Sequence, residues 1–149
     1  MFRNILIPTD GSKLSAKGVR TGVKLAKALG ARVTGLYVIF PYVPPVYGEG
    51  AIYYLPGMSA KESRKLYEKQ ARKALALIAG EAAKAGVRSR TSFVTAGQPW
   101  QAILRAARAG GCDAVVMASH GYSGFQELLL GSVTHKVLTH SRIPVLIYR

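Results

Sequence analysis

The chain is short of cysteine, of acidic residues and of long apolar runs. Cys112 is its single cysteine, so an intrachain disulfide framework is excluded and a reducing, cytoplasmic compartment is favoured. No uninterrupted apolar run approaches the roughly 18 residues of a membrane-spanning helix. The apolar run at the N-terminus is interrupted early by Pro8 and Asp10, so we expect neither a signal peptide nor a membrane span.

The shortage of acids leaves a large positive charge: 21 Lys and Arg against 7 Asp and Glu give a formal net charge of +14. Five of the cations recur at helical spacing with no acid among them: Lys13, Lys17, Arg20, Lys24 and Lys27. Like charges at this spacing repel by about 0.2–0.5 kcal/mol per pair. This stripe either serves solubility or attracts an acidic partner, RNA or an anionic membrane surface. It lacks the aromatic residues that suit single-stranded nucleic acid, and weak, salt-sensitive polyanion binding is our hypothesis for it.

Short aliphatic or β-branched runs alternate with helical patterns along the chain. We expect strands over Asn4–Pro8, Ala31–Ile39, Val87–Val94, Ala114–Ala118 and Pro144–Tyr148. We expect helices from Ser12 to Leu29, Ser59 to Ala85, Pro99 to Ala109 and Ser132 to His140. Strands separated by helices favour right-handed crossovers and a parallel sheet covered on both faces. We therefore predict one α/β domain over residues 1–149: a doubly wound, Rossmann-like, five-stranded sheet in the strand order 3-2-1-4-5.

Ligands of such sheets bind beyond the carboxyl ends of the strands, where the winding direction reverses. Here that point lies between the first and fourth strands. The first strand leads into Pro8, Thr9 and Asp10, whose carboxylate could accept hydrogen bonds from ribose hydroxyls. Asp10 is equally well explained by an Asx turn or a helix cap.

The loop after the fourth strand carries the opposite half of this predicted site. Ala118-Ser119-His120-Gly121 is followed, after nine intervening residues, by Gly131-Ser132, which opens a helix. Backbone N–H groups at such a helix start stabilise negative charge, so the two loops together outline a nucleotide. Taken alone, these glycines are more often simple turn and cap residues.

These motifs resemble those of the universal stress protein family, ATP-binding type, over essentially the whole chain. The family signature is Gly, two residues, Gly, nine residues, Gly, then Ser or Thr; here it falls on Ala118, Gly121, Gly131 and Ser132, so the first glycine is replaced. Further motifs match in the same order: Pro8-Thr9-Asp10, Gly97 with Pro99, and Arg142 with Pro144 and Val145.

The resemblance implies a role for each matching position. Asp10 would contact the ribose, the backbone at Val38 would contact adenine, and the four signature positions would surround the phosphates. The remaining expected site residues are their neighbours: Pro8, Thr9, Met117 and Val133. The implied cofactor is ATP, with Mg²⁺ or Mn²⁺ held through the phosphates and within reach of the Ser132 hydroxyl.

The resemblance also implies a homodimer through the last strand, whose unpaired sheet edge would otherwise be exposed. Between Phe40 and Met58 an unusually long Tyr- and Pro-rich connection is expected to form a flap over the nucleotide or a dimer contact, although its residues are also ordinary packing residues. We also expect a protein partner, whose identity the sequence does not indicate.

The predicted function is that of a regulatory, ATP-binding homodimer with at most slow hydrolysis. No catalytic residue is predicted, because no Walker lysine follows Gly131 and because Met117 replaces the first glycine of a nucleophile elbow around Ser119. The histidines lack metal-ligand spacing, so no protein metal site is predicted. The alternative is a nucleotide-free interaction module, or a protein that binds polyanions or nucleic acid through its basic helix. Whether the nucleotide is ATP, AMP or a cyclic nucleotide stays open.

Overall fold

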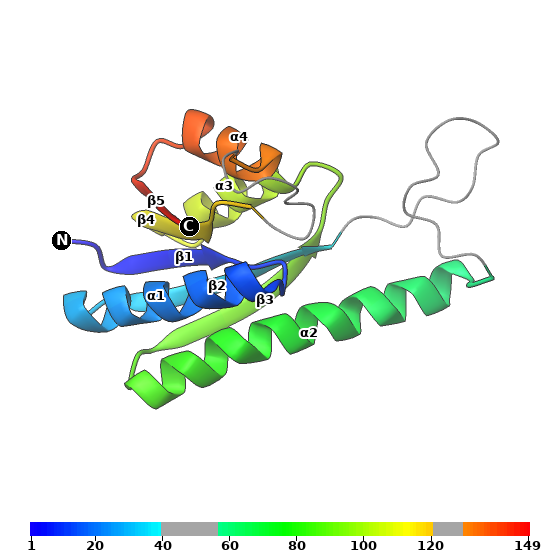
Figure 1. The fold of residues 1–149 in the computed structure, drawn as a ribbon, viewed down its shortest axis with the longest axis horizontal. Coiled ribbons are helices and arrows are strands. Elements are labelled where there is room, and N and C mark those ends of the chain that lie inside the picture. The colour runs from blue at the N-terminus through cyan, green and yellow to red at the C-terminus, as the bar shows by residue number, and fades with distance from the viewer. Residues whose placement is uncertain (40–56, 121–129) are drawn as a thin grey trace.

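A computed structural model describes residues 1–39, 57–120 and 130–149. Five parallel strands form one sheet in the order β3-β2-β1-β4-β5: β1 Asn4–Pro8, β2 Arg32–Ile39, β3 Ser89–Thr95, β4 Ala114–Ala118 and β5 Val145–Tyr148. The helices within the described residues are α1 Lys13–Leu29, α2 Ala60–Ala85, α3 Pro99–Ala109 and α4 Ser132–His140. Helices α1 and α2 cover one face, and α3 and α4 the other (Figure 1). The predicted fold class and strand order are confirmed.

Three strands begin later than the sequence pattern predicts. β5 begins one residue later, at Val145, because Pro144 before it has no N–H to donate to the sheet. β2 and β3 begin later because of how the preceding helices end. Gly30 and Gly86 end the preceding helices in the left-handed conformation, with φ of 64° and 70°. The N–H groups of Ala31 and Val87 then donate back to carbonyl oxygens of these helices at 2.8 Å. Both residues are buried and directly precede strand-like runs, but their N–H groups belong to the helix ends and not to the sheet. The third strand also continues one residue further, to Thr95.

The central strands are buried on both faces, as the sequence predicts for a parallel sheet with helices on both sides. Ile5 and Ile7 of β1 face the core beneath α1 and α2, whereas Leu6 faces the core beneath α3 and α4. Close packing of α1 depends on Gly22, where an added Cβ would lie 2.7 Å from Ile7 Cδ1. The helix therefore lies directly on the sheet next to β1 and β4.

A buried polar network joins the strands at the amino-terminal edge of the sheet. Asn4, 1% exposed, donates through Nδ2 to Gly110 O at 2.9 Å and accepts from the Thr34 hydroxyl at 3.0 Å. Asp113 accepts from the backbone N–H groups of Arg3 and Asn4 at 2.8 and 3.0 Å. This network fixes the start of β1 against β2 and the turn before β4.

The same network sets two pKa values. Partial burial of Asp113 opposes ionisation, but the N–H groups of Asn4 and Arg3 outweigh it and lower the pKa of the carboxyl. Burial raises the pKa of the Cys112 thiol. The cysteine is therefore a buried packing residue in its protonated form.

Two expectations fall wholly or partly outside the described residues. The Tyr- and Pro-rich connection predicted as a flap lies almost entirely within residues 40–56, and Gly121 lies within residues 121–129. In the described part of the chain, no helix is both long enough and apolar enough to cross a membrane.

Candidate functional site

The parallel register brings the described residues of the predicted site to the carboxyl-terminal end of the sheet. β1 pairs with β4 through Ile5↔Ala114 and Leu6↔Val115, so the carboxyl ends of both strands point the same way. On its other side β1 pairs with β2, with Pro8 opposite Leu36, two residues before Val38. The ends of three adjacent strands therefore meet where the winding of the fold reverses.

The loop after β1 is fixed by its own polar side chains. Buried Thr9 donates its N–H to Leu36 O at 2.9 Å, and its hydroxyl lies in a 2.6 Å hydrogen bond with Ser15 Oγ. Asp10 Oδ1 accepts from the N–H of Ser12 at 2.9 Å. This bond forms the Asx turn that the sequence offered as one explanation of Asp10. The turn holds the Asp10 carboxylate, partly buried, at the start of α1.

The chain leaves β4 at Ala118 and returns to the same place at Gly131. The N–H of Gly131 donates to Ser119 O at 2.8 Å, and the hydroxyl of Thr134 donates to Ala118 O at 3.0 Å. The N–H of Ser119 donates to Tyr148 O of β5 at 2.8 Å. These bonds hold the start of α4 directly against the end of β4.

The start of α4 presents backbone donors. Its N-cap, Gly131, provides no side-chain cap, and no acidic residue occupies its first turn. The N–H groups of Ser132 and Val133 at the start of a helix have no intrahelical acceptor. The hydroxyl-bearing Ser132 is exposed, whereas Val133 packs partly against the core. This arrangement fits an anionic group such as a phosphate.

Glycine at position 131 is favoured by limited space and not by backbone conformation. Its φ is −59°, which any residue can adopt. An added Cβ would lie 3.1 Å from His120 Cα and 3.3 Å from Ser119 O. A side chain at 131 would therefore push the two arms of the loop apart.

The alanine at the first signature position is compatible with the observed backbone. Ala118 is the last residue of β4, and no non-glycine residue in the described part of the chain has a positive φ. The left-handed freedom of glycine is not used there. The buried Met117 just before it packs into the core beneath α3 and α4.

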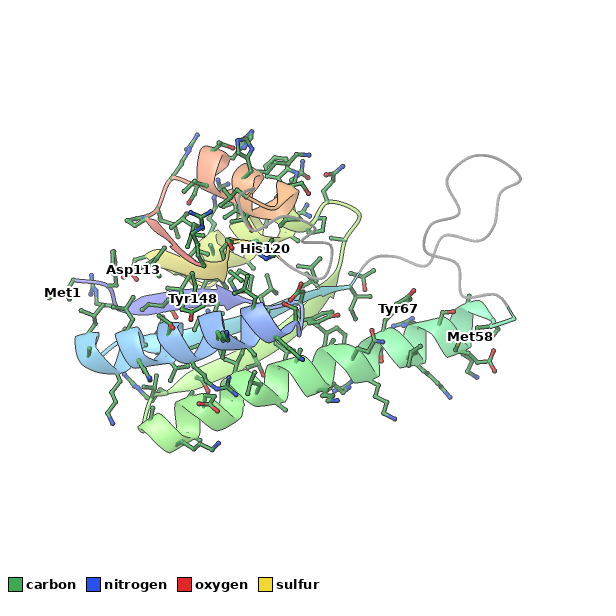
Figure 2. The ribbon with its side chains drawn as sticks, viewed as in Figure 1. Met1, Met58, Tyr67, Asp113, His120 and Tyr148 are labelled. Carbon is green, nitrogen blue, oxygen red and sulfur yellow. The ribbon has the colours of Figure 1, made fainter. Side chains whose placement is uncertain are left out.

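Ser119 and His120 do not form an accessible nucleophile. Ser119 Oγ lies 3.0 Å from His120 Nδ1, but Ser119 is only 3% exposed. Figure 2 shows His120 just beyond the carboxyl end of β4, with Asp113 at the strand's opposite end. Among the described residues, no three His, Cys, Asp or Glu side chains gather as they would around a metal ion.

Two buried hydroxyls that position the site were missed from the sequence. Ser15 holds Thr9, and Thr134 holds the end of β4. Each is a small polar residue on the buried side of its helix, at 5% and 3% exposure. A polar residue at a core-facing helical position was the signal, because a buried hydroxyl needs a hydrogen-bond partner.

A cavity of about 420 Å³ lies elsewhere, between α2 and β3. It is lined by Arg72, Leu75, Ala76, Ala79, Thr91, Ser92 and Phe93. The Arg72 guanidinium lies 5.3 Å from the centre of the Phe93 ring. This cavity is separate from the place where the ends of β1 and β4 meet the start of α4, so it does not correspond to the predicted site.

Comparison with known proteins agrees with this architecture. The Universal stress protein family model matches residues 1–149. The universal stress protein YxiE of Bacillus subtilis is 37% identical over 149 residues, covering 100% of both chains. The structure of MJ0577, a universal stress protein of Methanocaldococcus jannaschii, has a TM-score of 0.75 at 30% identity and covers 99% of this chain and 96% of its own. A universal stress protein in complex with cAMP has a TM-score of 0.67 at 25% identity, covering 99% of this chain and 97% of its own.

Proposed function

The chain belongs to the universal stress protein family, and from this premise we propose that it binds ATP as a regulatory ligand. The observation that carries the proposal is that two features lie at the carboxyl-terminal end of the sheet. These are the Asp10 turn after β1 and the start of α4 at Gly131, whose N–H donates to Ser119 O. A related protein in complex with cAMP supports an adenine nucleotide as the ligand class.

Each group in the proposed site has a chemical role. The Asp10 carboxylate accepts from ribose hydroxyls, and the backbone at Val38 lies along the adenine. The N–H groups of Ser132 and Val133 donate to phosphate oxygens, and the signature positions Ala118, Gly121 and Gly131 surround the phosphates. The N–H groups of Ser119 and Gly131 already donate within the protein. Bound Mg²⁺ or Mn²⁺ would neutralise phosphate charge, and the exposed Ser132 hydroxyl is the side chain at the helix start that could reach it.

Hydrolysis is at most slow in this proposal. Rapid phosphoryl transfer requires a group that orients the attacking water and cations that stabilise the developing charge. Ser119 is buried, and its Oγ is within hydrogen-bonding distance of the His120 imidazole. ATP therefore acts chiefly by stabilising the conformation to which it binds.

A thermal shift experiment tests nucleotide binding. ATP with magnesium at about 100 times its Kd should add about 2.7 kcal/mol to the unfolding free energy. Asp10→Ala should lose most of this gain, whereas Asp10→Asn keeps an acceptor for the Ser12 N–H and separates loss of charge from loss of the turn. Glu68→Gln, on α2, is the matched control and should respond like the unaltered protein.

AMP and cAMP, assayed in parallel, determine how many phosphates the site requires. The proposal fails if none of the three nucleotides raises the melting temperature. The role of Asp10 fails if Asp10→Ala and Glu68→Gln retain the same gain. Calorimetric titration gives the Kd of each nucleotide for each protein variant.

We also propose a homodimer through β5. This strand is at the sheet edge, and Leu146 on it is 44% exposed. A two-fold partner that pairs the same strand would satisfy its free backbone groups and bury this leucine. In sedimentation velocity, Leu146→Glu should yield monomers, while Val94→Glu on the opposite edge strand β3 should not. A monomeric unaltered protein would exclude this arrangement.

A further inference from the structure

Eight exposed cations lie together on one face of the protein. All five cations of the α1 stripe are exposed, and they lie opposite the buried side of the helix. Helix α2 lies beside α1 on the same face of the sheet (Figure 1). It contributes three more exposed lysines on the side away from its buried residues. The basic face comprises Lys13, Lys17, Arg20, Lys24, Lys27, Lys65, Lys69 and Lys73.

In the part of the chain that the structure describes, the acids of these two helices pair with only one cation of this face, Arg20. Glu62 is engaged in the capping box with Ser59, and Glu68 pairs with Arg64 at 3.0 Å. Glu81 lies 3.7 Å from Arg20 and 3.6 Å from Lys84. Within the described residues, the lysines of the basic face make no ion pair. An external polyanion would therefore meet unneutralised charge.

The surface chemistry separates the classes of partner. A helix that lies on a membrane inserts an apolar face into the lipid. The apolar face of α1 is buried in the core, and the large hydrophobic side chains exposed in the described chain lie elsewhere: Met1, Val94, Leu138 and Leu146. The cores of protein–protein interfaces are depleted in lysine. A lysine-rich face suits phosphates instead, because an ammonium is a point charge with little demand on geometry.

The dimensions and composition favour a duplex. The stripe from Lys13 to Lys27 is about 21 Å long at 1.5 Å per residue, which is long enough to reach phosphates on both sides of a major groove about 12 Å wide. Single strands are usually held by stacking on aromatic side chains, and α1 contains none. We propose that the basic face binds the phosphate backbone of double-stranded nucleic acid without reading its sequence.

Fluorescence anisotropy with short labelled DNA duplexes of two unrelated sequences tests this inference. The face variant carries Lys17→Gln, Lys24→Gln, Lys27→Gln and Lys73→Gln. The control variant carries Arg105→Gln, Arg108→Gln, Lys136→Gln and Arg142→Gln, four exposed cations on α3, α4 and the segment after α4. Both variants lose the same net charge, so they differ only in where it is lost. Circular dichroism confirms that each variant is folded.

The unaltered protein should bind both duplexes equally, with an affinity that falls steeply from about 50 to 200 mM salt. The face variant should bind at least about tenfold more weakly, with a salt slope shallower by about four. The control variant should keep most of the affinity.

Three results would overturn the inference. The first is no binding by the unaltered protein at the lowest salt. The second is an equal loss in the two variants, since net charge alone would then explain binding. The third is tighter, face-dependent binding to phosphatidylserine-containing vesicles than to the duplexes, which would identify a membrane surface as the partner.

Discussion

Restoring glycine at position 118 is expected to destabilise the protein without improving nucleotide binding. Ala118 ends β4, is 9% exposed and has no positive φ. Glycine in a strand costs about 0.5–1 kcal/mol relative to alanine, because it loses more conformational freedom on folding. Loss of the buried methyl group removes about 0.8 kcal/mol more. We expect Ala118→Gly to lower the unfolding free energy by about 1–2 kcal/mol.

Urea and thermal denaturation without nucleotide measure this loss. For a domain of this length the melting temperature should fall by about 2–8 °C. Calorimetric titration then compares the Kd for ATP, which should be unchanged because the backbone N–H is retained in the same conformation. Ala114→Gly, at the other end of β4 and 4% exposed, makes the same chemical change far from the site. It should lose similar stability.

A gain in ATP affinity would refute this reasoning. If Ala118→Gly bound ATP tenfold more tightly, equal to about 1.4 kcal/mol, the methyl group would be obstructing the phosphates. If its stability were unchanged while Ala114→Gly lost stability, the estimate of strand and burial costs at position 118 would be wrong.

The amino-terminal network provides two further predictions. Asn4→Ala removes hydrogen bonds to Gly110 and Thr34 and should cost about 2–4 kcal/mol in urea denaturation; a loss below about 1 kcal/mol would contradict the network's importance. Because the folded-state pKa of Asp113 is lowered, its carboxylate stabilises the protein at neutral pH, and this contribution disappears as pH falls through that pKa. Asp113→Asn should therefore be less stable at neutral pH and should approach the unaltered protein in acid, whereas a constant difference would exclude linkage.

The predicted helix boundaries agree with the structure to within one residue. The structure adds a capping box of Ser59 and Glu62 at the start of α2, which the sequence analysis did not use. The early strand starts predicted at Ala31 and Val87 have a physical cause. The strand-like run follows each of these residues, but the direction of each N–H depends on how the preceding helix ends.

The candidate site was only partly visible in the sequence. The order of Asp10, Gly131 and Ser132 was sufficient to propose two loops at one crevice. The Asx turn of Asp10 is a contact between residues two apart, and the sequence already offered it as one interpretation of Asp10. The bond from Thr134 to Ala118 at the end of β4 joins residues 16 apart and depends on packing. Hydrogen-bond partners distant in the sequence leave no periodic pattern.

The sequence by itself determined the alternation of strands and helices, the parallel sheet and the positive stripe on α1, because each follows from the spacing of residues along one element. Only the tertiary structure decided which charges remain unneutralised. Arg20 meets Glu81, 61 residues further along the chain, because α1 and α2 pack on the same face of the sheet. The same packing places the lysines of both helices on one surface, since a charge acts on its neighbours in space and not on its neighbours in sequence.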